Sequence, residues 1–114
     1  MNIAVPMMGG KFGSNLAAAD RLVVYRIDRA GRRVCTIDVQ HVDPVEGKTI
    51  DRLIQESNAD SIIVSREFNE IDCPLLHMEI DILLTQASGY PEQIINQYLY
   101  HPDYFTRFAP EMAC

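Results

Sequence analysis

The segment from Met7 to Lys11 combines residue types that can hold a metal-bearing ligand close to the main chain. Gly9 and Gly10 carry no side chain, so the backbone can approach a ligand closely. The thioethers of Met7 and Met8 can contact soft metals or sulfide surfaces, and Lys11 adds a positive charge. The alternative is an ordinary glycine turn in which the methionines fill gaps, because short glycine motifs often occur by chance.

Cys73 and His77 form a second candidate site, for a metal ion. They are four positions apart at the start of an expected helix, so their side chains can face the same side. Sulfur and imidazole ligands suit zinc or iron, whereas the alternative is a cysteine buried as a small hydrophobe. The three cysteines lie far apart and form no CxxC pair, so we expect neither a disulfide framework nor a zinc finger, and a cytoplasmic location.

Catalytic motifs are missing from the sequence. It contains no Gly-x-Ser-x-Gly, no His-Glu-x-x-His and no dinucleotide fingerprint. Glu67, Glu70 and Asp72 are typical of a solvated acidic edge rather than a catalytic pair. Lys48 lacks the upstream glycine of a phosphate loop. We therefore expect a protein that is not an enzyme, with no catalytic residues.

The hydrophobic pattern predicts an α/β fold. Strands are expected at residues 3–6, 22–27, 33–39, 61–65 and 80–85. Helices are expected at about residues 44–57, 74–79 and 91–100, with a brief helical turn at 15–19. Within the third strand, Cys35, Ile37 and Val39 alternate with Val34, Thr36 and Asp38, the pattern of a half-covered strand.

This order predicts a mixed five-stranded sheet flanked by helices, with an antiparallel hairpin at residues 22–39 and parallel strands after it. Ligands of open sheets bind outside the carboxyl ends of parallel strands. The loops at residues 7–17, 66–72 and 86–90 would share that edge. It would hold Arg66, Glu67, Phe68 and Asn69 beside Lys11. The alternative for these residues is a charged surface loop.

The charge is divided unevenly along the chain. The net charge is -6, with six bases and three acids in residues 1–42 and four bases and thirteen acids in residues 43–114. This excludes a broad electrostatic grip on nucleic acid. No apolar run approaches the roughly 20 residues that span a bilayer, so no membrane segment is expected. The arginines of the hairpin are candidates for a protein contact: Arg26, Arg29, Arg32 and Arg33.

The first strand and its loop, Ile3-Ala4-Val5-Pro6-Met7-Met8-Gly9-Gly10-Lys11, resemble the dinitrogenase iron–molybdenum cofactor biosynthesis family. Its NifX-like domains, also found at the end of NifB proteins, open with Ile-Ala-Val-Pro, two variable residues and Gly-Gly-Lys. The chain departs from the family pattern in two segments. Asn15, Leu16 and Ala17 stand where the family has His, Phe and Gly, and Arg66 to Asn69 replace its Gly-Gly-Ile-Gly turn.

The resemblance implies a ribonuclease H-like three-layer fold over residues 1–100, followed by a tail at 101–114. It also implies a carrier of iron–molybdenum cofactor or an iron–sulfur cluster precursor. Met7 to Lys11 and Asn15 would line the ligand loop, with Arg66 to Asn69 opposite. The alternative is an interaction or regulatory module that has lost cluster binding and docks through the arginine hairpin or the aromatic tail. The aromatic residues of that tail are Tyr104, Phe105 and Phe108.

Overall fold

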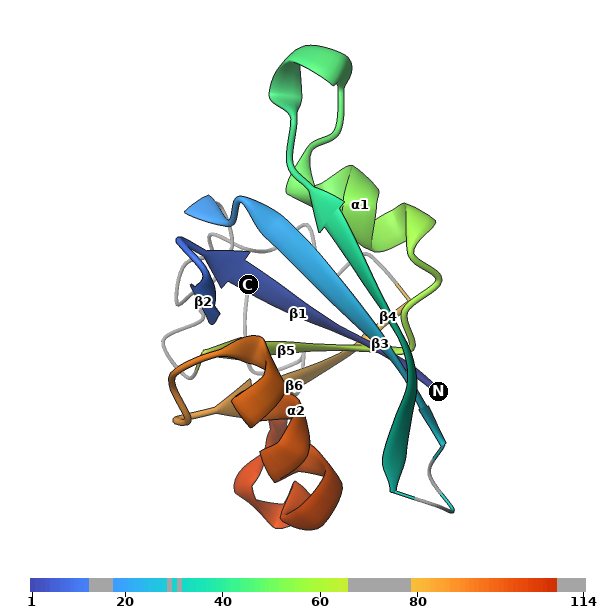
Figure 1. Cartoon of the computed structure of the whole chain (residues 1–114), viewed down its shortest axis with the longest axis vertical. Helices are drawn as coiled ribbons and strands as arrows, with labels where there is room; N and C mark the ends of the chain where they lie inside the picture. The colour runs from blue at the N-terminus through green and yellow to red at the C-terminus, as the bar shows by residue number, and fades with distance from the viewer. Residues whose placement is uncertain (13–17, 29, 31, 66–78, 109–114) are drawn as a thin grey trace.

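A computed structural model describes residues 1–12, 18–28, 30, 32–65 and 79–108 of the chain (Figure 1). Its strands are β1 (Asn2–Met8), β2 (Lys11–Phe12), β3 (Arg21–Asp28), β4 (Arg33–His41), β5 (Ser61–Ser65), β6 (Asp81–Thr85) and β7 (Thr106–Arg107). The helices are α1 (Ile50–Glu56) and α2 (Pro91–Tyr100), with two single 3₁₀ turns, η2 (Pro44–Glu46) and η4 (Pro102–Tyr104).

The seven strands of the described residues form one mixed sheet in the order β4-β3-β1-β5-β6-β7, and β2 pairs with the end of β1. Strands β4, β3 and β1 are antiparallel, whereas β1, β5 and β6 are parallel. The predicted combination of an antiparallel hairpin with parallel strands is confirmed. The predicted number of five strands is wrong, because β2 and β7 contain two residues each and are too short to show a hydrophobic period.

The sheet separates two hydrophobic cores, one under each helix. Ile3 and Val5 of β1 pack on the α2 side with Ile94 and Ile95, and Ala4 between them packs on the α1 side. Strand β5 is buried in the same way on both faces, as its uninterrupted apolar sequence predicts. Each fully buried isoleucine contributes about 1.5–3 kcal/mol, so these central strands are the main source of stability.

Helix α1 begins later than its sequence signals predict. Asp43 caps η2 and not a long helix, and Gly47, with a φ of 75°, ends that turn. The helix itself begins after Thr49, whose hydroxyl accepts a hydrogen bond from the Arg52 amide at 3.4 Å. Two backbone hydrogen bonds between Asp43 and Lys48, both 2.8 Å, close residues 43–48 into an arm that projects beyond the sheet (Figure 1).

A β-bulge interrupts the alternation of β4. Thr36 lies opposite Arg26, but Val34 lies opposite Ile27, so Cys35 is an extra residue without a partner in the register. Val34 therefore packs against the α2-side core. The prediction that Val34 and Ile37 face opposite sides is wrong, because Ile37 lies opposite Tyr25 of the same core. The strand is also less covered than predicted, since only Val34 and Gln40 are even partly buried.

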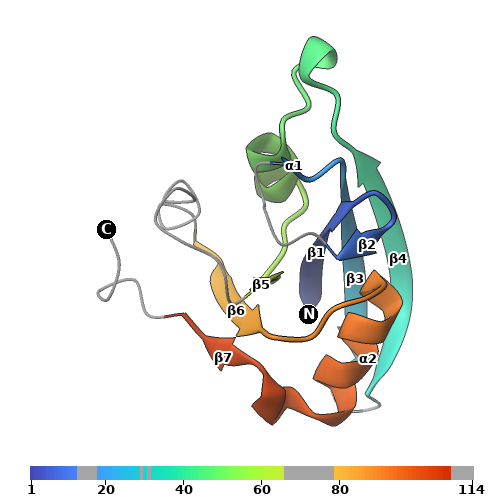
Figure 2. The ribbon, with the colours of Figure 1, turned by 90° about the vertical axis from the view of Figure 1, so that its left-hand side faces the viewer.

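After α2 the chain returns to the sheet. Phe105 is buried in the α2-side core and makes an edge-to-face contact with Tyr98, with ring centroids 5.4 Å apart. Strand β7 then pairs with β6, and Arg107 forms a 2.7 Å ion pair with Asp81. Phe105, one of the aromatic residues of the expected tail, therefore packs against the domain. Figure 2 shows β7 continuing the sheet beyond β6.

Some predicted elements cannot be compared with the structure. The helical turn at 15–19 and the helix at 74–79 fall almost entirely outside the described residues. Within the part of the chain that the structure describes, no helix is long and apolar enough to cross a membrane.

Candidate functional site

The turn between β1 and β2 holds the glycines of the candidate ligand loop. Met8 pairs with Lys11, and Gly9 and Gly10 make the two-residue connection between them. Their φ angles are 62° and 86°, the pair of positive values that a type I′ hairpin turn requires. Glycine adopts both without strain, so the local geometry explains the Gly-Gly dipeptide.

Within the part of the chain that the structure describes, the turn leaves space for a ligand. Apart from the adjoining residues, no described heavy atom lies within 4 Å of the position that a Cβ would occupy at Gly9 or Gly10. Met8 is 43% exposed and Lys11 is exposed as well. Because directly opposed residues of a hairpin share a face, the Met8 thioether and the Lys11 ammonium group lie on the same side. The arrangement therefore presents a soft sulfur ligand and a cation together.

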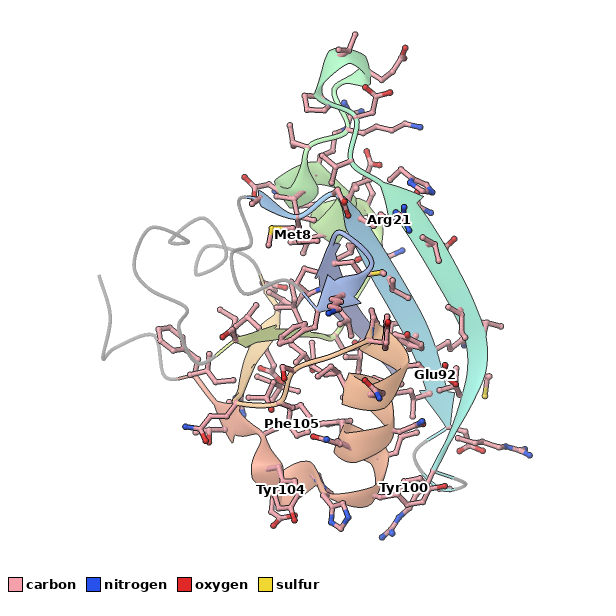
Figure 3. The ribbon with its side chains drawn as sticks, turned by 60° about the vertical axis from the view of Figure 1, so that its left-hand side comes forward. Met8, Arg21, Glu92, Tyr100, Tyr104 and Phe105 are labelled. Carbon is pink, nitrogen blue, oxygen red and sulfur yellow. The ribbon has the colours of Figure 1, made fainter. Side chains whose placement is uncertain are left out.

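Met7 has a different environment from Met8. Successive strand residues point to opposite faces, and Met7 packs against the α2-side core. In the register of β1 with β3 it lies opposite Arg21, which brings a second cation to this end of β1. Figure 3 shows Met8 and Arg21 from these neighbouring strands. Sequence reasoning missed Arg21 because it lies opposite Met7 only through the register of β1 with β3.

A carboxylate fixes the turn from the side. The amide of Gly9 donates a 3.1 Å hydrogen bond to Oδ2 of Asp20, and the amide of Asp20 donates a 2.9 Å bond to the carbonyl of Met7. Asp20 precedes β3, whose first residue pairs with Met7. The Gly9 amide is therefore already bonded to an anion. Sequence reasoning missed Asp20 because it lies outside the glycine motif.

The loop before α2 lies against the same hairpin. The amide of Phe12 in β2 donates a 2.7 Å hydrogen bond to the carbonyl of Gly89. The loop ends at Tyr90, whose amide donates to Oε1 of Gln93 at 3.0 Å at the beginning of α2. The expected proximity of the first and third loops is therefore shown for Phe12 and Gly89, whereas residues 13–17 and 66–72 of the expected edge lie outside the described residues.

Several candidate site residues fall outside the described residues. They are Asn15, Arg66, Glu67, Phe68 and Asn69 of the predicted ligand loops and the pair Cys73 and His77. Among the residues that the structure describes, no three His, Cys, Asp or Glu side chains gather as a metal site.

A polar pocket of about 420 Å³ lies after the carboxyl end of β6. Its lining residues come from three segments: Thr85, Gln86, Ala87, Gln97, Asp103 and Tyr104. Among the described residues they offer carboxamides, hydroxyls and one carboxylate but no lysine or arginine, so the pocket suits a neutral or cationic polar ligand. Sequence reasoning missed it because no local motif joins segments this far apart.

A buried phenol lies in the core beneath α2. Burial raises the pKa of Tyr25 above its ordinary value of 10.0, and the negative charge of Glu92 raises it further. Glu92 belongs to the first turn of α2 (Figure 3). Tyr25 therefore remains neutral at physiological pH and serves as a core side chain.

No protein-family model matches the sequence, and no curated protein matches it either. Solved structures do match. A crystal structure of a "putative dinitrogenase" from Methanocaldococcus jannaschii superposes with a TM-score of 0.73 at 16% identity, covering 96% of this chain and 95% of that one. An NMR structure of that protein gives a TM-score of 0.72 at 16% identity, with 96% and 93% coverage.

A further match is the crystal structure of PH0822, with a TM-score of 0.69, 14% identity and 96% coverage of both chains. The present chain therefore has the α/β fold of these proteins over nearly its whole length. The resemblance drawn from residues 3–11 is confirmed at the level of the fold.

Proposed function

We propose that this chain is a small binding or carrier protein for an anionic metal–sulfur cluster. The cargo would be iron–molybdenum cofactor or an iron–sulfur precursor, in nitrogenase cofactor biosynthesis or a related pathway, and the role would not be catalytic. One observation carries the proposal, namely the open Met8–Lys11 turn at the carboxyl end of β1. The fold shared with the "putative dinitrogenase" supports the nitrogenase connection.

The ribonuclease H-like assignment of the fold belongs to the same proposal. Its support is the sheet order β4-β3-β1-β5-β6, antiparallel across the first three strands and parallel across the rest. In such a sheet a ligand at the carboxyl ends of the parallel strands would meet the β1–β2 turn.

The exposed residues of the turn have the chemistry that such a cargo requires. A thioether such as that of Met8 is a soft ligand that suits iron in sulfide surroundings, and the Lys11 ammonium group favours an anionic cluster. Gly10 leaves room for a bulky cluster to approach. The Gly9 amide already donates to Asp20, so the cargo would be held by few contacts. Few contacts favour release, which a carrier requires.

The pocket after β6 fits this cargo poorly. Its lining, as far as the structure describes it, contains Asp103 and no cation, so an anionic cluster would be repelled there. The turn and the pocket therefore suit ligands of opposite character, and the cluster proposal concerns the turn alone.

The experiment is an anaerobic titration of the apoprotein with ferrous iron and sulfide, or with a preformed [4Fe–4S] cluster. We expect a sulfide-to-iron charge-transfer band that Lys11→Ala and Met8→Leu weaken, with Cys73→Ser testing a further ligand. Lys48→Ala is the matched control, because Lys48 is the other lysine of the chain and lies on the 43–48 arm. Absence of bound iron in the wild-type chain would overturn the proposal.

An interaction module remains the second candidate function. Arg26, Arg32 and Arg33 are exposed, as is most of β4. A partner with an acidic surface would bind to this basic region. Such a module would bind no iron in the titration, and its complex would weaken with Arg33→Glu but not with Lys11→Ala.

A further inference from the structure

Strand β4 forms one edge of the sheet, and its outer edge has no partner strand among the described residues (Figure 1). It is nine residues long and contains no proline. Ile37 is 60% exposed and Val39 is 46% exposed. Long, apolar edge strands readily pair with another chain, and proteins usually shield them.

The exposed apolar side chains of β4 lie on one face. Ile37 lies opposite Tyr25, and Val39 lies opposite Val23. Both partners belong to the α2-side core, so Ile37 and Val39 extend that core beyond the area that α2 covers. Asp38 points to the other face. The edge therefore presents an apolar α2-side face and a polar α1-side face.

We propose that a second copy of this chain pairs with β4, antiparallel and edge to edge, to form a symmetric dimer with a continuous sheet. This pairing through β4 does not depend on the proposed binding of a metal–sulfur cluster. A two-fold axis perpendicular to the sheet keeps each side chain on its own face, so the pairing must be centred on a residue and not between two residues.

The side chains select Ile37 as that central residue. A pairing centred on Asp38 would oppose two carboxylates, which is destabilising. A pairing centred on Thr36 would place Ile37, the more exposed of the two apolar side chains, opposite the irregular bulge at residues 34–35. The pairing centred on Ile37 opposes the two Ile37 side chains and places each Val39 opposite the bulge at residues 34–35 of the second copy.

Charge complementarity between the two ends of β4 supports the second copy as occupant. Residues 26–33, around the β3–β4 turn, carry four arginines and one aspartate. Residues 38–48, from the second half of β4 through the arm, carry three acids and one lysine. Antiparallel pairing brings the basic end of each copy to the acidic end of the other at both ends of the interface.

The 43–48 arm lies at the acidic end of β4. It projects past the end of β4, and Val45 at its tip is 94% exposed (Figures 1 and 2). In the pairing centred on Ile37, the arm of one copy extends past Arg33, the first residue of β4 in the other.

The first test is sedimentation velocity of the full chain across a concentration series. We expect a concentration-dependent monomer–dimer equilibrium. Ile37→Lys should raise the dimer dissociation constant at least about tenfold, because it opposes two like charges at the axis. Tyr104→Lys is the control, because it also replaces an exposed aromatic or aliphatic side chain by lysine but lies on η4. It should leave the dimer dissociation constant unchanged. A chain that stays monomeric at every concentration would overturn the proposal, because the edge of β4 would then be open to solvent or to another partner.

The second test fixes the register by disulfide cross-linking. The background is a chain in which all three native cysteines are replaced, by Cys35→Ser, Cys73→Ser and Cys114→Ser. In it, Ile37→Cys should form a covalent dimer on mild oxidation, because the Cα atoms of directly opposed residues lie about 4.5–5.5 Å apart. Thr36→Cys should not, because its two copies would be offset along the strands. Faster cross-linking through Thr36→Cys than through Ile37→Cys would overturn the register.

Discussion

The carboxylate of Asp20 holds the amide of Gly9 at 3.1 Å, so a negative charge stabilises the same turn that presents Lys11. The Asp20 amide also bonds the Met7 carbonyl, which ties the turn to the beginning of β3. Asp20 therefore has two effects on an anionic ligand. It positions the turn, and it opposes the charge of the ligand.

Replacing Asp20 separates these two effects. Asp20→Asn keeps a side-chain oxygen that can accept from Gly9 but removes the charge, so we expect the turn to bind an anionic cluster roughly three- to tenfold more tightly at low salt. Asp60→Asn is the matched control, because Asp60 accepts a 2.8 Å bond from the Asn2 amide at the opposite end of β1. Titration of both variants measures the difference, and equal affinity would contradict the charge effect.

Tyr25 should make the fold sensitive to alkaline pH. Below pH 10 the folded and unfolded chains both keep the Tyr25 proton. Above pH 10 the unfolded chain loses it while the raised pKa keeps it on the folded chain, so the free energy of unfolding falls as pH rises. The slope from this one proton is at most about 1.4 kcal/mol per pH unit.

Urea unfolding at a series of alkaline pH values checks this expectation. Tyr25→Phe should flatten the decline, and Glu92→Gln should reduce it in part because Glu92 is the second cause of the raised pKa. Tyr100→Phe, at an exposed phenol, should leave the decline as it is. If the free energy of unfolding of Tyr25→Phe falls with rising pH as steeply as that of the wild type, the decline comes from other groups.

Two isoleucines should respond very differently to truncation. Ile94 is completely buried between α2 and the sheet, so Ile94→Ala should lower the free energy of unfolding by about 2–5 kcal/mol. Ile37→Ala removes an exposed side chain and should change monomer stability by less than about 0.5 kcal/mol. Chemical denaturation at low protein concentration measures both, and similar losses would contradict the described exposure of β4.

Phe105 tests whether the chain after α2 contributes to the fold. Phe105→Ala removes a buried ring that contacts Tyr98 and should cost about 3 kcal/mol of unfolding free energy. Tyr104→Ala, at the exposed neighbouring position, should cost much less. Equal stability of Phe105→Ala and the wild-type chain would show that this segment does not pack as described.

The sequence predicted the elements whose signals are local. The apolar run at 61–65 and the stripe of α2 gave strand and helix at the right places, and parallel pairing followed from their alternation. Other features depend on partners. The bulge at Cys35 arises from pairing with β3, and β2 and β7 exist only through hydrogen bonds to neighbouring strands.

The candidate site also combines residues that have a local sequence signal with residues that have none. Gly9, Gly10 and Lys11 were recognisable because one short motif contains them. Asp20 contacts the turn, and Arg21 lies opposite Met7, only through the antiparallel register, and the pocket after β6 assembles side chains from three segments. A single sequence contains no signal for such contacts until the strand order is known.

Iron and acid-labile sulfide in the protein purified without oxygen test the central proposal most directly. We predict that the wild-type chain retains both in comparable amounts, that Lys11→Ala retains much less, and that Lys48→Ala retains as much as the wild type. Iron and sulfide at background level in the wild-type chain, with its fold intact by circular dichroism, would contradict the assignment of this fold as a cluster carrier.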